Sequence, residues 1–419
     1  MAGGTVRIVH AADLHLDSPL AGLAEYEGAP VGEVRRATRR AFVGLVDFCL
    51  EKKVDVLLLA GDLYDGDFRD FATGLFFVEQ VTRLKDAGTR VVWLRGNHDA
   101  ESRMTRHLRL PDNVFELRTQ SPETIVFEDL GAAFHGQGYG ERDVTQNLVR
   151  AYPPPVSGAL NVGLLHTALE GRPGHANYAP ATLAELLARG YDYFALGHVH
   201  TREVLSTEPY VVFSGNLQGR HIRETGPKGA TLIEAPRGKI EAVTPIELDV
   251  VRWEHLEISL GEARNLEDVL DLVERSLSRA TERASGRIVA CRVTLSGETE
   301  AHAQLAARER LVSELRAISV ALGPVYLEKV AVKTRGPVSE ALLTARADAL
   351  ADLFRFIESA RADREVREEL KSTIASELSS LPHELVEQEL ADWEEVVASA
   401  SRLLEAKLLA PGGGEEGGK

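Results

Sequence analysis

The sequence predicts an α/β protein made of successive parts, and the pattern of apolar residues is the main reason. From Val6 to about Ala235, runs typical of buried strands alternate with amphipathic helices, an order that favours parallel strands with helices on the faces of the sheet. A shorter alternation runs from Arg252 to Arg335, and Glu340 to Leu409 is helical in pattern. Because 419 residues exceed one typical core, we expect two or three domains.

The first part begins with a strand at Val6–Ala12 and continues as a βαβαβ unit. Helix Glu33–Lys53 carries small or apolar residues on one face and arginines on the other, and helix Asp70–Ala87 is ended by Gly88. Further strands are expected at Val54–Ala60, Val91–Leu94, Val114–Leu117, Thr124–Glu128, Ala132–Gly136, Asn161–Leu165 and Tyr191–Leu196, with Tyr210–Ser214 and Gly229–Glu234 as a closing pair.

The second part, residues 251–336, is predicted to be a small α/β accessory domain that follows a first domain at residues 1–250. Its expected elements are the strands His255–Leu260, Ile288–Leu295 and Val325–Lys333 and the helices Leu266–Ala284 and His302–Leu322. It contains none of the candidate site residues described below.

The third part is a predicted helical segment at residues 337–410, followed by a Gly-rich and Glu-rich tail at 411–419 that we expect to be disordered. Apolar residues recur at helical spacing around Phe354 and around Trp393, and acidic residues outnumber basic ones, which argues against a DNA-binding arm. Two interpretations stay open: the helices pack on their own protein, or they dock a partner coiled coil.

Polar side chains with metal-binding chemistry follow several of these strands. His198 and His200 end one strand, and because side chains at i and i+2 share a face of an extended segment, both imidazoles can reach one small volume. Four other strands end in the same kind of residue: Asp13-Leu14-His15, Gly61-Asp62-Leu63-Tyr64-Asp65, Gly96-Asn97-His98-Asp99 and His166. Ligands bind at the carboxyl edge of open α/β sheets, so we expect these residues to converge there.

Carboxylate, amide oxygen and imidazole without thiolate form a ligand set that suits Mn²⁺, Mg²⁺, Fe²⁺ or Zn²⁺. Two such ions about 4 Å apart need a bridging ligand, and Asp62 is the candidate. A histidine that binds neither ion could protonate the leaving oxygen of a phosphoester. We interpret Asp65 and Asp17 as residues that orient imidazoles or water, and His10 as a core residue rather than a ligand.

In order and spacing, these motifs resemble those of the calcineurin-like metallophosphoesterases. The resemblance implies a sandwich of mixed β-sheets flanked by helices. It also implies that one metal is held by Asp13, His15, Asp62 and His200, and the second by Asp62, Asn97, His166 and His198. By the same resemblance, His98 is the catalytic histidine near the leaving group, and Asp99 supports it through a hydrogen bond.

Within that superfamily the chain is similar to the DNA repair exonuclease branch, which includes the SbcD-type nucleases and the bacterial YhaO-like proteins. The similarity lies in Val9–Pro19, Gly61–Asp65, Leu165–Thr167 and Gly174–Pro180, and in the accessory domain followed by helices. It implies manganese-dependent cleavage of DNA, and a partnership with an SMC-like ATPase whose coiled coil meets the C-terminal helices.

The composition of the chain limits which other classes of protein it can belong to. With 44% apolar and 27% charged residues and no run of about 18 apolar residues, the chain reads as a soluble protein without a membrane span. Met1–Thr5 leads directly into a strand without a leader, so we expect a cytoplasmic protein. Cys49 and Cys291 read as buried apolar residues rather than a disulfide. A net charge of −16 argues against a broad nucleic-acid-coating surface, but not against an enzyme that holds phosphates through metals.

Alternative functions remain at this point. The same chemistry would suit a metallophosphatase or phosphodiesterase that acts on a small molecule or nucleotide, and a dimerising phosphatase could also carry the long extension after the first domain. A non-enzymatic scaffold is a third reading, and the presence of every expected ligand argues against it.

Overall fold

The computed structural model of the chain describes residues 4–20, 31–65, 71–101, 109–169, 178–236, 238–337, 347–378, 390 and 393–409. The expected disordered tail at 411–419 lies outside the described residues. By contacts the chain divides into two compact units, one made of residues 1–256, 274–293 and 316–330, and the other of 257–273, 294–315 and 331–419. The predicted domain boundaries at 250 and 336 stay predictions.

The first sheet of the first unit has the strand order β12-β11-β1-β2-β3-β4. Its strands are β1 (Thr5–Ala11), β2 (Val56–Ala60), β3 (Arg90–Leu94), β4 (Val114–Glu116), β11 (Gly229–Pro236) and β12 (Ala242–Glu247). β1 to β4 pair in parallel, as the βαβαβ pattern predicts, whereas β11 and β12 add antiparallel strands beside β1. The carboxyl ends of β1, β2 and β3 therefore meet at one edge of this sheet.

The second sheet has the order β5-β6-β7-β8-β10-β9. Its strands are β5 (Glu123–Phe127), β6 (Ala132–Gly136), β7 (Leu160–His166), β8 (Tyr193–Gly197), β9 (Glu203–Thr207) and β10 (Tyr210–Phe213). β6, β7, β8 and β10 are parallel, and the outer strands β5 and β9 are antiparallel. Thus β7, which ends at His166, is the neighbour of β8, which is followed by His198 and His200.

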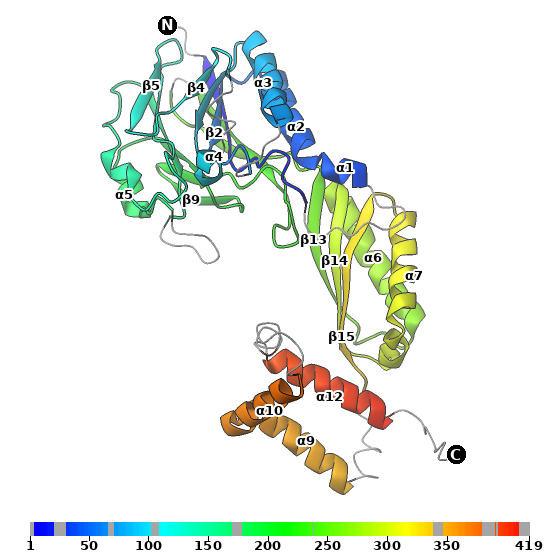
Figure 1. Cartoon of the computed structure of the whole chain (residues 1–419). Helices are drawn as coiled ribbons and strands as arrows, with labels where there is room; N and C mark the ends of the chain where they lie inside the picture. The colour runs from blue at the N-terminus through cyan, green and yellow to red at the C-terminus, as the bar shows by residue number, and fades with distance from the viewer. Residues whose placement is uncertain are drawn as a thin grey trace. The chain divides into compact units, whose positions relative to one another are not determined.

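Helices cover the outer faces of the two sheets (Figure 1). The short and long helices of this unit are α1 (Val31–Arg35), α2 (Ala37–Lys52), α3 (Phe71–Asp86), α4 (Asn97–Glu101), α5 (Leu183–Leu187) and the 3-10 helix η2 (Leu148–Ala151). In β2, Leu57 packs under α2 and α3, whereas its neighbours Val56 and Leu58 pack toward the second sheet. Two mixed sheets packed face to face between helices confirm the predicted fold class.

The space between the sheets is an apolar core with one buried histidine in it. His10 of β1 is fully buried, and its Nδ1 is 3.0 Å from the hydroxyl of Tyr193 in β8, with which it forms a hydrogen bond across the core. Burial lowers the pKa of His10 to about 3, so the ring is neutral at physiological pH. This placement fits the interpretation of His10 as a core residue.

One pairing expectation is wrong. Tyr210–Ser214 and Gly229–Glu234 are strands, but they do not close the fold as a pair, because β10 joins β8 in the second sheet and β11 joins β1 in the first. Both segments are apolar strands next to each other along the chain, and nothing in their side-chain pattern indicates that the chain crosses between sheets there. β9 and β12 are further strands, beyond those that the sequence pattern predicts.

The later residues form a three-stranded sheet with helices, followed by further helices. The elements are β13 (Val251–Ser259), α6 (Leu266–Ala284), β14 (Ile288–Glu298), η3 (Glu300–Ala306), α7 (Arg308–Ala321), β15 (Val325–Arg335), α9 (Ala347–Ala362), α10 (Arg364–Glu377) and α12 (Trp393–Leu409). Cys49 and Cys291 are both buried and free, as expected. Among the described residues, no helix is both long and apolar enough to span a membrane.

Candidate metal centre

The polar residues predicted from the strand ends come together at one edge of the sandwich. There are three groups of residues in each of which the potential ligand atoms all lie within 4.8 Å of one another. They are Asp13, His15 and His200; His15, Asp62 and His98; and Asp62, His166 and His198. These residues follow β1, β2 and β3 of the first sheet or lie at and after the ends of β7 and β8 of the second, so the site lies where the edges of both sheets meet.

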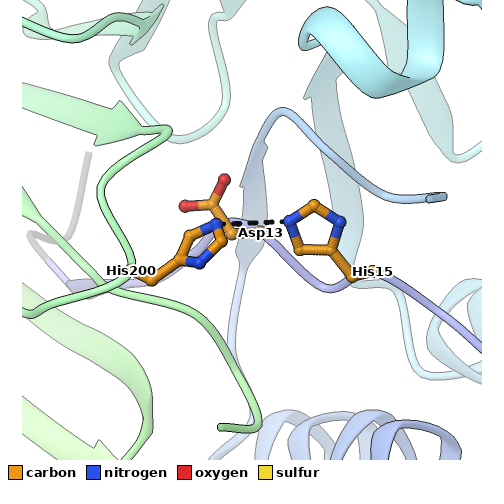
Figure 2. A group of neighbouring side chains, drawn as sticks. All are labelled: Asp13, His15 and His200. Carbon is orange, nitrogen blue, oxygen red and sulfur yellow. Dashed lines mark hydrogen bonds between the residues drawn. The ribbon is translucent and has the colours of Figure 1, made fainter. Parts of the chain in front are cut away.

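The first ligand set is centred on two imidazoles that face each other. His15 Nε2 and His200 Nε2 are 3.3 Å apart, with the carboxylate of Asp13 beside them (Figure 2). His200 donates from Nδ1 to Glu224 Oε1 at 2.7 Å, and His15 turns its Nδ1 toward Asp65 Oδ1 at 3.4 Å. With protons on the Nδ1 atoms, two bare Nε2 atoms point at each other, an arrangement that a divalent cation between them would satisfy.

The second ligand set contains a similar cluster of acceptors. His166 donates from Nδ1 to the carbonyl oxygen of Ala60 at 2.9 Å, so in the neutral, metal-binding form of the ring the free electron pair is on Nε2. That Nε2 atom lies 3.0 Å from Asn97 Oδ1 and 3.4 Å from Asp62 Oδ2. Three electron-pair donors face one point, so these residues also fit a divalent cation.

Asp62 is adjacent to both sets, as a bridging ligand must be. Its Oδ2 atom lies 3.4 Å from His166 Nε2 and 3.9 Å from His15 Nε2. Its Oδ1 atom accepts a hydrogen bond from the backbone N–H of His98 at 3.0 Å, which fixes the orientation of the carboxylate. Asp62 is the described carboxylate that lies within reach of both imidazoles.

Backbone hydrogen bonds hold the ligand-bearing loops against one another. The N–H of His198 donates to both carboxylate oxygens of Asp13 at 3.0 Å, which ties the loop after β8 to the loop after β1. Asp13 and His15 in turn donate from their own N–H groups to the carbonyl oxygens of Gly61 and Asp62, each at 3.0 Å. Loops from both sheets are therefore locked together before any metal is considered.

Several of the ligand residues have a backbone conformation that non-glycine residues rarely adopt. Asp13, His15, Asp62 and His198 have φ values of 52°, 42°, 53° and 94°. Positive φ costs free energy in a residue with a Cβ atom, and such residues gather at sites where a function requires them. Their concentration in the loops after three strands supports a functional role for these loops.

Two glycines let the loops approach closely. A Cβ atom on Gly61, which has φ +94°, would lie 2.3 Å from His166 Nδ1. A Cβ atom on Gly197 would lie 1.9 Å from the carbonyl oxygen of Ala60, the same oxygen that receives the His166 hydrogen bond. Any side chain at either position would push His166 out of its present orientation.

His98 lies beside the first ligand set but is more accessible than its ligands. Its side chain is 32% exposed, whereas that of His15 is 1% exposed. His98 Nδ1 lies 3.3 Å from Asp65 Oδ1, the same oxygen that faces His15. Asp65 therefore orients two imidazoles, as its place in the second motif suggested.

Asp99 occupies a different position from the one expected for a partner of His98. Its carboxylate accepts hydrogen bonds from the backbone N–H groups of Leu63, Tyr64 and Gly96 at 3.2, 3.0 and 3.0 Å, and so joins the loops after β2 and β3. Burial raises the pKa of Asp99 to about 7, and the charge of Asp62 adds to that rise. The role of Asp99 in supporting His98 stays a prediction, and Asp65 is the carboxylate whose contact with His98 Nδ1 the structure describes.

Two functional residues were missed by the sequence reasoning. Glu224 and Arg220 lie on the loop between β10 and β11, and both contact the ring of His200. The available signal was a run of charged residues between two strands at the ligand-bearing edge of the sheet. This run alone does not indicate a metal site, because the loop contains none of the ligand motifs.

Burial and charge oppose each other in the centre. Burial lowers the pKa of His15 to about 4, and the positive charge of Arg220 adds to this. Burial would also lower the pKa of His166, but the carboxylate of Asp62 outweighs it and raises that pKa to about 9. Burial alone would raise the pKa of Asp62, yet its interactions with His166 hold it well below the ordinary value. Asp62 is therefore ionised at physiological pH, as a bridging ligand requires.

Comparisons with known proteins give a consistent picture. Residues 6–202 match the family described as calcineurin-like phosphoesterase, and residues 253–335 match the middle domain of metallophosphoesterase YhaO. The uncharacterized metallophosphoesterase YhaO of Bacillus subtilis is 35% identical over 293 residues, which cover 69% of this chain and 71% of that protein.

Two proteins named DNA double-strand break repair protein Mre11 are also similar. The one from Methanopyrus kandleri is 29% identical, over 74% of this chain and 70% of its own length. The one from Sulfurisphaera tokodaii is 25% identical, over 50% of this chain and 56% of its own length.

Proposed function

The chain belongs to the calcineurin-like metallophosphoesterase family, as the motifs indicated, and from this premise we propose that it is a two-metal-dependent nuclease that cleaves DNA. Membership of the family makes it a metal-dependent phosphoester hydrolase. The observation that carries the finer proposal is the similarity to a protein named for DNA double-strand break repair, which extends over 74% of this chain and so beyond the first 250 residues. A small-molecule hydrolase would not need to share the later residues with such a protein.

The proposed ligands are those expected from the resemblance. Asp13, His15, Asp62 and His200 would hold one ion, and Asp62, Asn97, His166 and His198 the other. When bound, two divalent cations would activate a water molecule and offset negative charge on the phosphate during in-line attack. Mn²⁺ is the proposed ion, and Mg²⁺, Fe²⁺ and Zn²⁺ suit the same donors.

The protein groups around the ions would orient the reaction. Asp65 holds the Nδ1 side of His98, so the opposite nitrogen of this exposed ring can donate a proton to the leaving oxygen. Ala60, Asp65 and Glu224 fix the tautomers of the imidazole ligands, and this raises their basicity toward the metals.

The net charge of −16 places a condition on DNA binding. A chain this acidic gains little from diffuse attraction to a phosphate backbone, so its affinity for DNA should depend on the bound metals or on a partner. We therefore expect weak DNA binding in the presence of a chelator.

For the C-terminal helices we propose docking to the coiled coil of an SMC-like ATPase in DNA repair. α9 and α12 pack on each other: Trp393 Nε1 donates to the carbonyl oxygen of Ala360 at 2.9 Å, and Val397 is buried nearby. Phe356 remains 52% exposed and Leu378 39% exposed, which are apolar side chains that a partner could cover. Deleting residues 340–419 should leave hydrolysis of a simple phosphodiester unchanged and abolish ATPase binding. Binding of the truncated chain at full affinity would exclude this docking site.

The proposed activity is tested with purified full-length protein, Mn²⁺ and end-labelled single- and double-stranded DNA. Metal-dependent cleavage that disappears in Asp62→Ala supports the nuclease, and the ladder of products gives its polarity. Hydrolysis of bis-p-nitrophenyl phosphate without any cleavage of DNA, also after addition of the ATPase, would instead support the alternative of a phosphodiesterase or phosphatase with a small-molecule substrate. Sedimentation analysis of the same samples tests the remaining partner prediction, a homodimer.

A further inference from the structure

We propose that Arg220 is a positioning residue that joins the two carboxylates, Asp65 and Glu224, which orient the imidazoles of the first ligand set. This inference rests on the proposed metal centre and adds to it a residue outside the ligand motifs. Arg220 lies on the loop between β10 and β11, and its side chain is 16% exposed.

The guanidinium of Arg220 lies between the two carboxylates. Its Nη1 atom is 3.7 Å from Asp65 Oδ1, and its Nη2 atom is 3.7 Å from Glu224 Oε1. Nη2 is also 3.4 Å from His200 Nδ1, and Nη1 donates to Ser18 Oγ at 3.4 Å. At these separations the attraction is mainly that of opposite charges, which remains considerable beside a largely buried group.

The two carboxylates belong to different parts of the sandwich. Asp65 follows β2 of the first sheet, and Glu224 follows β10 of the second. Asp65 faces His15 and His98, whereas Glu224 accepts from His200. One guanidinium therefore connects the supports of three imidazoles across the edge where the sheets meet. Loss of its positive charge would remove the guanidinium that lies within 3.7 Å of both acidic groups.

The backbone around Arg220 is fixed by residues at the start of β13. Gln218 accepts from the N–H groups of Val250 and Val251 at 2.8 and 3.1 Å, and Trp253 donates from its indole N–H to the carbonyl oxygen of Gly219 at 2.9 Å. The backbone N–H of Arg220 itself donates to Glu224 Oε2 at 2.7 Å. A guanidinium carried by a loop held this firmly can determine the position of its neighbours rather than follow them.

Arginine suits this position better than lysine. A planar guanidinium presents separate N–H groups to two acceptors, whereas an ammonium is a compact charge at the end of a flexible chain. Arg220→Lys should therefore restore part of what Arg220→Ala loses. Arg223, an exposed residue of the same loop, offers a matched control.

The test is a calorimetric titration of metal-free full-length protein with Mn²⁺, together with electron paramagnetic resonance of the loaded samples. Wild type should bind two ions and give the signal of a coupled pair. Arg220→Ala should weaken one site by about 10- to 100-fold and leave the other unchanged, since residues that support metal ligands have effects of this size. When Mn²⁺ is limiting, Arg220→Ala should show the resonance signal of a single Mn²⁺ ion instead of that of a coupled pair.

Two further measurements separate positioning from other roles. Methylguanidinium at millimolar concentration should recover part of the lost affinity in Arg220→Ala, and Arg223→Ala should match wild type throughout. Circular dichroism checks folding, and Arg220→Gln replaces Arg220→Ala where the latter does not fold.

The outcomes distinguish the two proposals. Failure of wild type to bind two Mn²⁺ ions would contradict the proposed metal centre itself. Two ions bound equally well by wild type and by Arg220→Ala would overturn the positioning role alone. The same holds if the variant keeps its metal affinity and only raises KM for bis-p-nitrophenyl phosphate, because Arg220 would then bind substrate.

Discussion

The two ligand sets around Asp62 are supported by different parts of the protein. His166, in the second set, is fully buried, and its Nδ1 donates to a main-chain carbonyl, that of Ala60 in β2. His200, in the first set, is 20% exposed and donates to the side chain of Glu224 on a loop. The carbonyl group of Ala60 is held in place by the hydrogen bonds of the sheet. The carboxylate of Glu224 belongs to a single side chain, which a substitution can remove.

The two ligand sets should therefore respond differently to substitutions around them. The second set should be rigid and sensitive to anything that alters the packing of the strands. The first set should be adjustable, because separate side chains orient its imidazoles and a change in one of them leaves the fold intact. The following substitutions address both sets, neither set, or one set at a time.

The largest effect is expected from Asp62→Ala, which removes the ligand shared by both sets. Each bound metal can supply several kcal/mol of transition-state stabilisation, so loss of both should lower kcat by about 10⁵-fold or more. Metal content and hydrolysis of bis-p-nitrophenyl phosphate are the measurements. Asp129→Ala, which removes a carboxylate that is 61% exposed and paired with Arg90, is the control and should behave as wild type.

His98→Ala should leave both ligand sets intact and still stop turnover. Loss of a general acid lowers kcat by about 10²- to 10⁴-fold, and the affinity for Mn²⁺ should stay unchanged because His98 is not among the proposed ligands. Single-turnover kinetics with metal-loaded protein checks both statements. Normal kcat in the metal-replete variant would remove His98 from its proposed role.

Glu224→Gln should affect the first set alone. The amide keeps the size of the side chain but loses its charge, so the orientation of His200 weakens and Mn²⁺ affinity at that set should fall by about 10- to 100-fold. A two-site calorimetric titration resolves the two affinities. Glu208→Gln, at an exposed position, serves as the matched control. An equal loss at both sets would mean that they are not supported separately.

Gly61→Ala should affect the second set alone, by about 10-fold in affinity, because the new Cβ atom would meet His166 Nδ1. Gly88→Ala is a close control: Gly88 also has positive φ, +83°, but nothing lies within 4 Å of its Cβ position. Both variants should lose some stability to heat through the strained backbone, and only Gly61→Ala should lose metal affinity. Equal metal affinities in the two variants would contradict the close contact at His166.

The sequence allowed the strands other than β9 and β12, and the polar residues at the strand ends, to be predicted, for physical reasons that can be named. β2, β3 and β8 are short apolar runs followed directly by polar residues, so both the strand and its functional end are visible in the local pattern. The i, i+2 rule used for His198 and His200 assumes an extended segment, whereas β8 ends at Gly197 and His198 has φ 94°. The fold class followed from the alternation and from the resemblance that these residues carry.

Contacts that depend on tertiary structure could not be predicted in this way. Asp65 and Asp99 are both acidic residues next to a motif, and only the folded chain shows which of them faces the ring of His98. Glu224 reaches His200 from 24 residues further along the chain, through a loop that crosses from one sheet to the other. The pairing of β10 with β11 was wrong for the same reason, because strand pairing between sheets depends on the tertiary structure.

The most direct test of two ligand sets sharing Asp62 is a crystal structure of the Mn²⁺-loaded protein with anomalous data collected at the manganese absorption edge. We expect two anomalous peaks, one coordinated by Asp13, His15 and His200, the other by Asn97, His166 and His198, with Asp62 bound to both. A single peak, or a second peak that Asp62 does not touch, would contradict this expectation.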